Sequence, residues 1–105
     1  MEFTGNEGAP IALAQAGEWT KNYRSENPGA TQGHFFGRVI LEQLLAEGGS
    51  KGIRFYYGLD DEGRRQFLAV AADAAQNDLL GDECIIADDS WTTPPYSGIA
   101  NDLNS

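Results

Sequence analysis

The sequence predicts a small α+β domain in which two N-terminal helices pack on one face of a three-stranded antiparallel meander, in the order α-α-β-β-β. Two early stretches with apolar residues at helical spacing, a central aromatic and β-branched run, and a turn after that run predict this class. The 105 residues fit one domain. We expect a flexible leader over residues 1–8, the domain over residues 9–88, and an extended C-terminal arm over residues 89–105.

The first predicted helix begins near Pro10, which suits a first helical turn because its missing N–H has no partner there in any case. The apolar side chains that follow share one helical face: Ala12, Ala16, Trp19 and Tyr23. Residues 27–29, Asn-Pro-Gly, end the helix because the residue before proline is disfavoured in the α region.

The second predicted helix has Thr31 as its N-cap. Its apolar stripe consists of Phe36, Val39, Ile40 and Leu44. The pair Gly48-Gly49 is typical of a helix C-terminus, so we expect the helix to end there.

A strand is predicted over residues 52–58, where aromatic and β-branched residues lie between two glycines, the composition of a central strand. Residues 60–63, Asp-Asp-Glu-Gly, have the composition of a four-residue hairpin loop, with Gly63 available for a positive φ. Such a loop pairs Leu59 with Arg64, and it places Tyr56 opposite Phe67.

Residues 65–72 fit two structures. Their alanines favour a helix, whereas the apolar run directly after a turn fits a returning strand, and periodicity does not decide between them. An acidic connection over residues 73–83 follows. Residues 84–87 are then the candidate for a third, short strand at the sheet edge.

The predicted register divides the sheet into two unlike faces. One face carries Ile53, Phe55, Leu68 and Val70 and suits contact with the helices, which can cover only one side. The other face, with an arginine and aromatic rings, is left to solvent, to the C-terminal arm or to a partner; arginine and tyrosine are enriched in interface cores. The residues expected at an interface are Arg54, Tyr56, Phe67, Ala69, Trp91 and Tyr96.

The net charge of −9 argues against nucleic acid and anionic membranes as partners, because both require a basic surface. All seven Lys and Arg residues lie at or before Arg65, so the C-terminal part is purely acidic. This acidity either keeps the protein soluble or forms a docking surface for a basic protein.

Residues able to support catalysis or metal binding are few. His34 is the one histidine and Cys84 the one cysteine, and the acidic residues 60–62 lack the ligand spacing of a calcium loop. We therefore assign no catalytic, cofactor-binding or metal-binding residue and expect no cofactor. No apolar run approaches the ~20 residues of a membrane span. With no signal peptide recognisable in residues 1–8, we expect a cytoplasmic location.

Several short motifs, in this order, resemble a family of small uncharacterised proteins of Bacteroidetes. They are Trp19 with Asn22-Tyr23, His34-Phe35-Phe36-Gly37, Gly52-Ile53-Arg54-Phe55-Tyr56-Tyr57, Asn77-Asp78, Ile86-Ala87-Asp88 and a proline-containing tail. The resemblance implies a strand over residues 68–73, which we adopt, but no mechanism. Family members carry a Cys-Pro-x-x-Cys tail where this chain has residues 93–97; both cysteines are absent, so no thiol, metal or disulfide role carries over.

The sequence does not specify a biochemical activity. We expect a non-enzymatic module that self-associates through the outer sheet face and its ends, forming a homo-oligomer. The alternative is an acidic docking or inhibitor module for a basic protein. A small carboxylate-based hydrolase is a third hypothesis, which no particular residue pattern supports.

Overall fold

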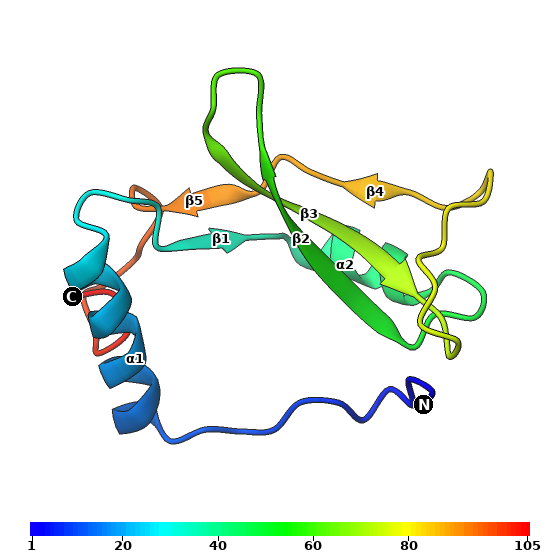
Figure 1. The fold of residues 1–105 in the computed structure, drawn as a ribbon, viewed down its shortest axis with the longest axis horizontal. Helices are drawn as coiled ribbons and strands as arrows, with labels where there is room; N and C mark the ends of the chain where they lie inside the picture. The colour runs from blue at the N-terminus through cyan, green and yellow to red at the C-terminus, as the bar shows by residue number, and fades with distance from the viewer. The chain divides into compact units, whose positions relative to one another are not determined.

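The computed structural model describes residues 1–105, and the chain forms two compact units. The sheet unit consists of Met1–Glu7 and Phe36–Ser90, and the α1 unit consists of Gly8–Phe35 and Trp91–Ser105. The predicted α+β class with two helices is confirmed (Figure 1). The element order is α-β-α-β-β-β-β, so the predicted order lacked two short strands, one before the second helix and one at the end.

The sheet unit contains the predicted three-stranded antiparallel meander. Its strands are β2 (Gly52–Leu59), β3 (Arg65–Ala72) and β4 (Ile86–Ala87), in the spatial order β2-β3-β4. The alanine-rich segment is therefore a strand, as the resemblance implied. It also occupies the middle of the sheet, as the second strand of a meander does, so β2 lies at an edge although it has the composition of a central strand.

The register between β2 and β3 differs by one residue from the predicted one. Leu59 pairs with Arg65, and Tyr56 pairs with Leu68. The physical reason is a loop of five residues rather than four: the Asp60 N–H donates to the carbonyl of Arg64 at 2.9 Å. Gly63 has the positive φ expected of it, +80°. Because side chains alternate between the two faces of a strand, a shift of one residue changes which β3 side chains share a face with a given β2 side chain.

The core of the sheet unit lies between α2 (Arg38–Leu45) and one face of the sheet. Leu44 is fully buried against Ala69 and Ala71, whose small side chains let the helix approach the strand closely. The partly buried side chains that complete this core are Phe36, Ile40, Ile53, Leu79 and Ile85. Figure 1 shows α2 lying along the hairpin of β2 and β3.

The second helix begins later than predicted. Thr31 is not its N-cap; the helix starts at Arg38 with Gly37 in an extended conformation before it. Residues 33–35, expected to be helical, form β1 (Gly33–Phe35), which pairs with β5 (Trp91–Thr93). Pairing with a strand almost sixty residues away overrides the local helix signal, a contact that local sequence does not reveal.

The α1 unit combines α1 (Leu13–Glu26) with this two-stranded sheet and the C-terminal residues. The helix ends directly before Asn27-Pro28, as predicted. Arg24 donates to the carbonyls of Leu103 at 2.7 Å and Ser105 at 3.0 Å. Because α1 belongs to this unit, the predicted packing of both helices on the three-stranded sheet is not confirmed. Neither helix has the length and apolarity that crossing a bilayer requires.

Candidate functional site

The six predicted interface residues belong to both units, and the four in the sheet unit lie on two different faces of the sheet. Arg54 and Tyr56 lie on the outer sheet face, opposite Val70 and Leu68. The other four lie elsewhere: Phe67 and Ala69 are on the α2 face, and Trp91 and Tyr96 are in the α1 unit. The predicted grouping of Phe67 and Ala69 with Arg54 and Tyr56 is therefore wrong, and the one-residue register shift is the cause.

The α2 face instead carries a continuous row of aromatic rings, here called the aromatic row: Phe36, Phe55, Phe67 and Tyr57. The centroids of successive rings in that order are 5.9, 6.0 and 5.1 Å apart. These separations lie in the range where aromatic pairs attract each other. The row starts beside α2 and ends at Tyr57, whose side chain is 85% exposed, while Phe55 is 46% exposed.

Part of the aromatic row lies on an open sheet edge. β2 has a neighbouring strand on one side only. The Asp60 backbone N–H donates to the Arg64 carbonyl, so these two residues form a hydrogen-bonded pair. Because such pairs alternate along an antiparallel ladder, the even-numbered residues of β2 direct their backbone N–H and C=O groups toward β3. Phe55 and Tyr57, with Ile53 and Leu59, therefore direct their N–H and C=O groups to the open edge. The same residues present both aromatic surface and backbone groups free to pair.

On the outer face, Arg54, Tyr56 and Asp78 form a hydrogen-bonded cluster. Asp78 accepts a bond from Arg54 Nη1 at 2.6 Å and from the Tyr56 hydroxyl at 2.6 Å. The bond from Tyr56 is the main cause that lowers the pKa of Asp78, and Arg54 adds to it. The bond to Asp78 in turn raises the pKa of Arg54. The polar ends of Arg54 and Tyr56 thus have partners within the unit, and this face is not a bare interface.

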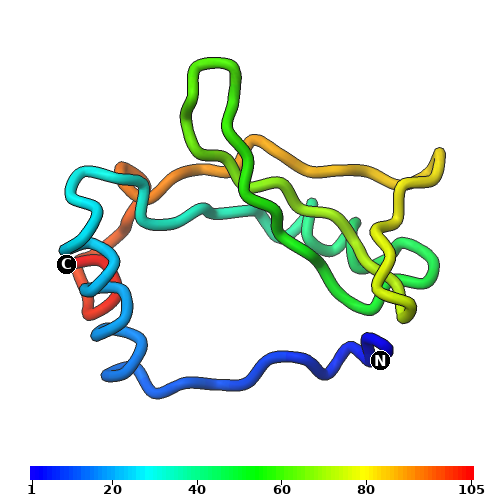
Figure 2. Tube along the Cα trace, viewed as in Figure 1, coloured from blue at the N-terminus to red at the C-terminus, as the bar shows by residue number.

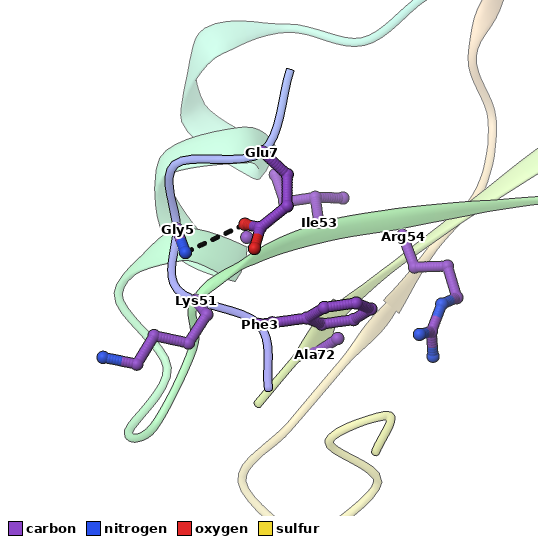
Figure 3. A pocket seen from close by; sticks show the side chains of 8 residues that line it. Phe3, Gly5, Glu7, Lys51, Ile53, Arg54 and Ala72 are labelled. Atoms are coloured by element: carbon purple, nitrogen blue, oxygen red, sulfur yellow. Dashed lines mark hydrogen bonds between the residues drawn. The ribbon is translucent and has the colours of Figure 1, made fainter. Parts of the chain in front are cut away.

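A cavity of about 340 Å³ adjoins this cluster, between β2 and the first residues of the chain. Its lining includes Phe3, Ile53 and Ala72 together with the charged side chains Glu7, Lys51 and Arg54. The Arg54 guanidinium carbon lies 5.3 Å from the centre of the Phe3 ring, a cation–π arrangement. Figure 3 shows the Phe3 ring beside Ala72 and the Lys51 side chain pointing away from that ring.

Glu7 shapes the segment that carries Phe3. Its carboxylate accepts the backbone N–H groups of Thr4 at 2.8 Å and Gly5 at 2.9 Å. These bonds, that of Thr4 first, lower the pKa of Glu7 to about 2. The role of Phe3 escaped the sequence interpretation because the leader has no periodicity; the available signal was a lone aromatic residue among small and polar ones.

The α1 unit has an aromatic cluster of its own. The rings of Trp91 and Tyr96 are 4.7 Å apart, and Trp91 pairs across the strands with Phe35. All three side chains are exposed. His34, next along β1, pairs with Thr92, and partial burial lowers its pKa.

The remaining polar candidates of the sequence are Cys84 and the acidic residues of the loop at Asp60. No three His, Cys, Asp or Glu residues lie close enough together to hold a metal ion. Cys84 is a free, partly buried thiol. The Asp60 carboxylate accepts hydrogen bonds from its own loop and from Gln66.

Comparisons with protein-family models, with curated proteins and with solved structures find no match to this chain. The resemblance to the Bacteroidetes family therefore stays a prediction.

Proposed function

We propose that the protein is a non-enzymatic interaction module that associates with a second copy through the aromatic row and the open edge of β2. The observation that carries this proposal is the position of Phe55 and Tyr57. They are exposed aromatic residues on a strand whose edge has no neighbour. An exposed apolar edge strand is a template for pairing with another strand. The homo-oligomer predicted from the sequence is proposed here again, with a different face as the interface.

The sequence of β2 suits antiparallel pairing with itself. About a two-fold axis at Tyr56, Phe55 pairs with Tyr57 of the second copy, and Ile53 pairs with its Leu59. Arg54 then lies opposite Gly58 rather than another arginine, so no like charges meet. In this register the odd-numbered residues of the two copies lie opposite each other. Their outward N–H and C=O groups can therefore form the hydrogen bonds between the two β2 strands.

The energetics favour a weak, concentration-dependent dimer. Full burial of an aromatic or large aliphatic side chain contributes roughly 1.5–3 kcal/mol, and each dimer buries parts of several such side chains. Association costs at least about 4 kcal/mol in lost translational and rotational freedom. The net charge of −9 on each copy opposes the contact further at low salt.

A specific observation also supports the alternative of a basic partner. The other sheet edge, β4, lies between two exposed acidic pairs, Asp82-Glu83 and Asp88-Asp89. Like charges at that edge disfavour pairing of β4 with itself and suit a basic segment instead. Binding there weakens as salt rises, whereas association through β2 tightens.

Nuclear magnetic resonance at increasing protein concentration tests the proposal. We expect backbone amide shifts in β2, largest at Phe55 and Tyr57, and their loss in Tyr57→Ser. The matched control is Leu80→Ser, which changes an exposed apolar side chain outside the aromatic row. Spectra that do not depend on concentration, or shifts confined to residues outside β2, contradict the proposal.

A further inference from the structure

Residues Met1–Glu7 form an arm that lies against the sheet unit. The Phe3 N–H donates to the carbonyl of Ala74 at 2.9 Å, and the Gln76 side-chain amide donates to the carbonyl of Met1. The Phe3 ring lies under the Arg54 guanidinium. In Figure 2 the arm, in dark blue, lies beside the segment that follows β3. The residues that receive it, Arg54, Ala72, Ala74 and Gln76, are here called the arm seat.

The arm lies on the outer sheet face, where Val70 and Ala72 are each 3% exposed, and not on the face that packs against α2. The fully buried residues Leu44, Ala69 and Ala71 lie between the sheet and α2, on the opposite face from Arg54. Residues 8–12, which follow the arm, are exposed and outside any helix or strand. Gly8 has a φ of +103° and no atom within 4 Å of an added Cβ, so nothing packs against the connection at this residue.

The arm seat has the properties of a peptide site. It offers a cation that can lie over an aromatic ring, a backbone carbonyl acceptor and a side-chain amide donor, and the adjoining cavity of about 340 Å³ leaves room beside Phe3. The segment it holds bends at Gly5, where the Glu7 carboxylate accepts the backbone N–H groups of Thr4 and Gly5.

We propose that the arm seat is an exchangeable site: Met1–Glu7 of one copy occupies the arm seat of a second copy. Every contact made within one chain is then remade between chains, which makes such exchange a low-cost route to dimers. A chain's own arm competes at an effective concentration on the order of millimolar. Exchange therefore requires copies that are already close together, so this inference rests on the proposed association through β2.

The test measures binding of a fluorescently labelled peptide with the sequence of residues 1–8 to the full-length chain. In the Phe3→Ala chain the chain's own arm is a poor competitor, and we expect the peptide to bind at least about tenfold more tightly than to the wild-type chain. A peptide with alanine in place of Phe3 is the matched control, and its binding is expected to be at least about tenfold weaker. Equal affinities of the two peptides, or no binding to the Phe3→Ala chain, overturn the proposal.

A second experiment separates this inference from the proposed function. The double variant Phe3→Ala, Tyr57→Ser is expected to bind the peptide as Phe3→Ala does, although its association through β2 is lost. Exchange between whole chains is measured by energy transfer in a mixture of Phe3→Ala, which lacks a functional arm, and Arg54→Met, which has a weakened seat. The Arg54→Met arm can fill the intact seat, so we expect more transfer than in Arg54→Met alone. Concentration-dependent β2 shifts without peptide binding overturn arm exchange and leave the proposed function standing.

Discussion

Asp60 stabilises the loop between β2 and β3. This loop sets the register of the two strands, and the aromatic row depends on that register. Its carboxylate accepts the backbone N–H groups of Glu62 and Arg64, each at 2.9 Å, and the side chain of Gln66 at 3.0 Å. The backbone bond of Arg64 is the first cause that lowers the pKa of Asp60 to about 2. The charged form of this carboxylate therefore stabilises the folded state.

A pH prediction follows from this lowered pKa. The stabilisation by Asp60 is complete above the ordinary aspartate pKa near 4 and is lost as the pH falls toward 2. We expect Asp60→Asn to be less stable than the wild type at pH 7, with a smaller loss of stability between pH 4 and 2. Urea unfolding at several pH values measures this. Asp61→Asn, one residue along, is the control; a wild-type pH dependence in Asp60→Asn contradicts the assignment.

The cluster on the outer face gives a second prediction for a single residue. The Tyr56 hydroxyl is the main cause of the lowered pKa of Asp78, so Tyr56→Phe should raise that pKa toward its ordinary value. The carboxyl carbon signal of Asp78, followed during a pH titration, reports this directly. Tyr57→Phe removes a hydroxyl that makes no bond to Asp78 and is expected to leave the pKa unchanged. An unaltered pKa in Tyr56→Phe shows instead that Arg54 alone lowers it.

At the scale of the elements, α2 is the helix that closes the core of the sheet unit. Leu44 is 0% exposed, so Leu44→Ala should reduce the free energy of unfolding by about 2–5 kcal/mol. Val39 lies on the same helix but is 79% exposed, and Val39→Ala should change it by less than about 0.5 kcal/mol. Urea unfolding compares the two variants. Equal effects of the two substitutions contradict this packing of α2.

The elements with strong local patterns could be predicted from the sequence. The end of α1 at the proline, the strand of residues 52–58 and the glycine turn of the hairpin follow from backbone restrictions that act within a few residues. The strand assignment of the alanine run required the resemblance, because alanine favours a helix. Burial of Ala69 and Ala71 beneath α2 explains why small residues occur there in a strand.

The features that depend on distant contacts could not be predicted. β1 exists because it pairs with β5, far away in the sequence. The register of the hairpin depends on one extra loop residue that the Asp60 carboxylate stabilises. That single residue decided which side chains of β3 share a face with Tyr56, so the predicted interface combined residues from opposite faces. The seat of Phe3 likewise depends on tertiary contacts alone.

At the scale of the whole molecule, charge and aromatic surface act against each other. The net charge of −9 keeps copies apart, while the aromatic row and the open edge of β2 favour contact. Salt screens the first effect and leaves the second largely unchanged. The direction of the salt response therefore distinguishes association through β2 from binding of a basic partner by the acidic residues around β4.

Sedimentation equilibrium of the wild-type chain at low and high salt, with Tyr57→Ser in parallel, tests self-association most directly. The proposed β2 contact predicts a dimer whose fraction rises with protein concentration and with salt, and a Tyr57→Ser chain that stays monomeric under the same conditions. A wild-type chain that remains monomeric at high concentration and at both salts contradicts it. So does a dimer that Tyr57→Ser leaves unchanged.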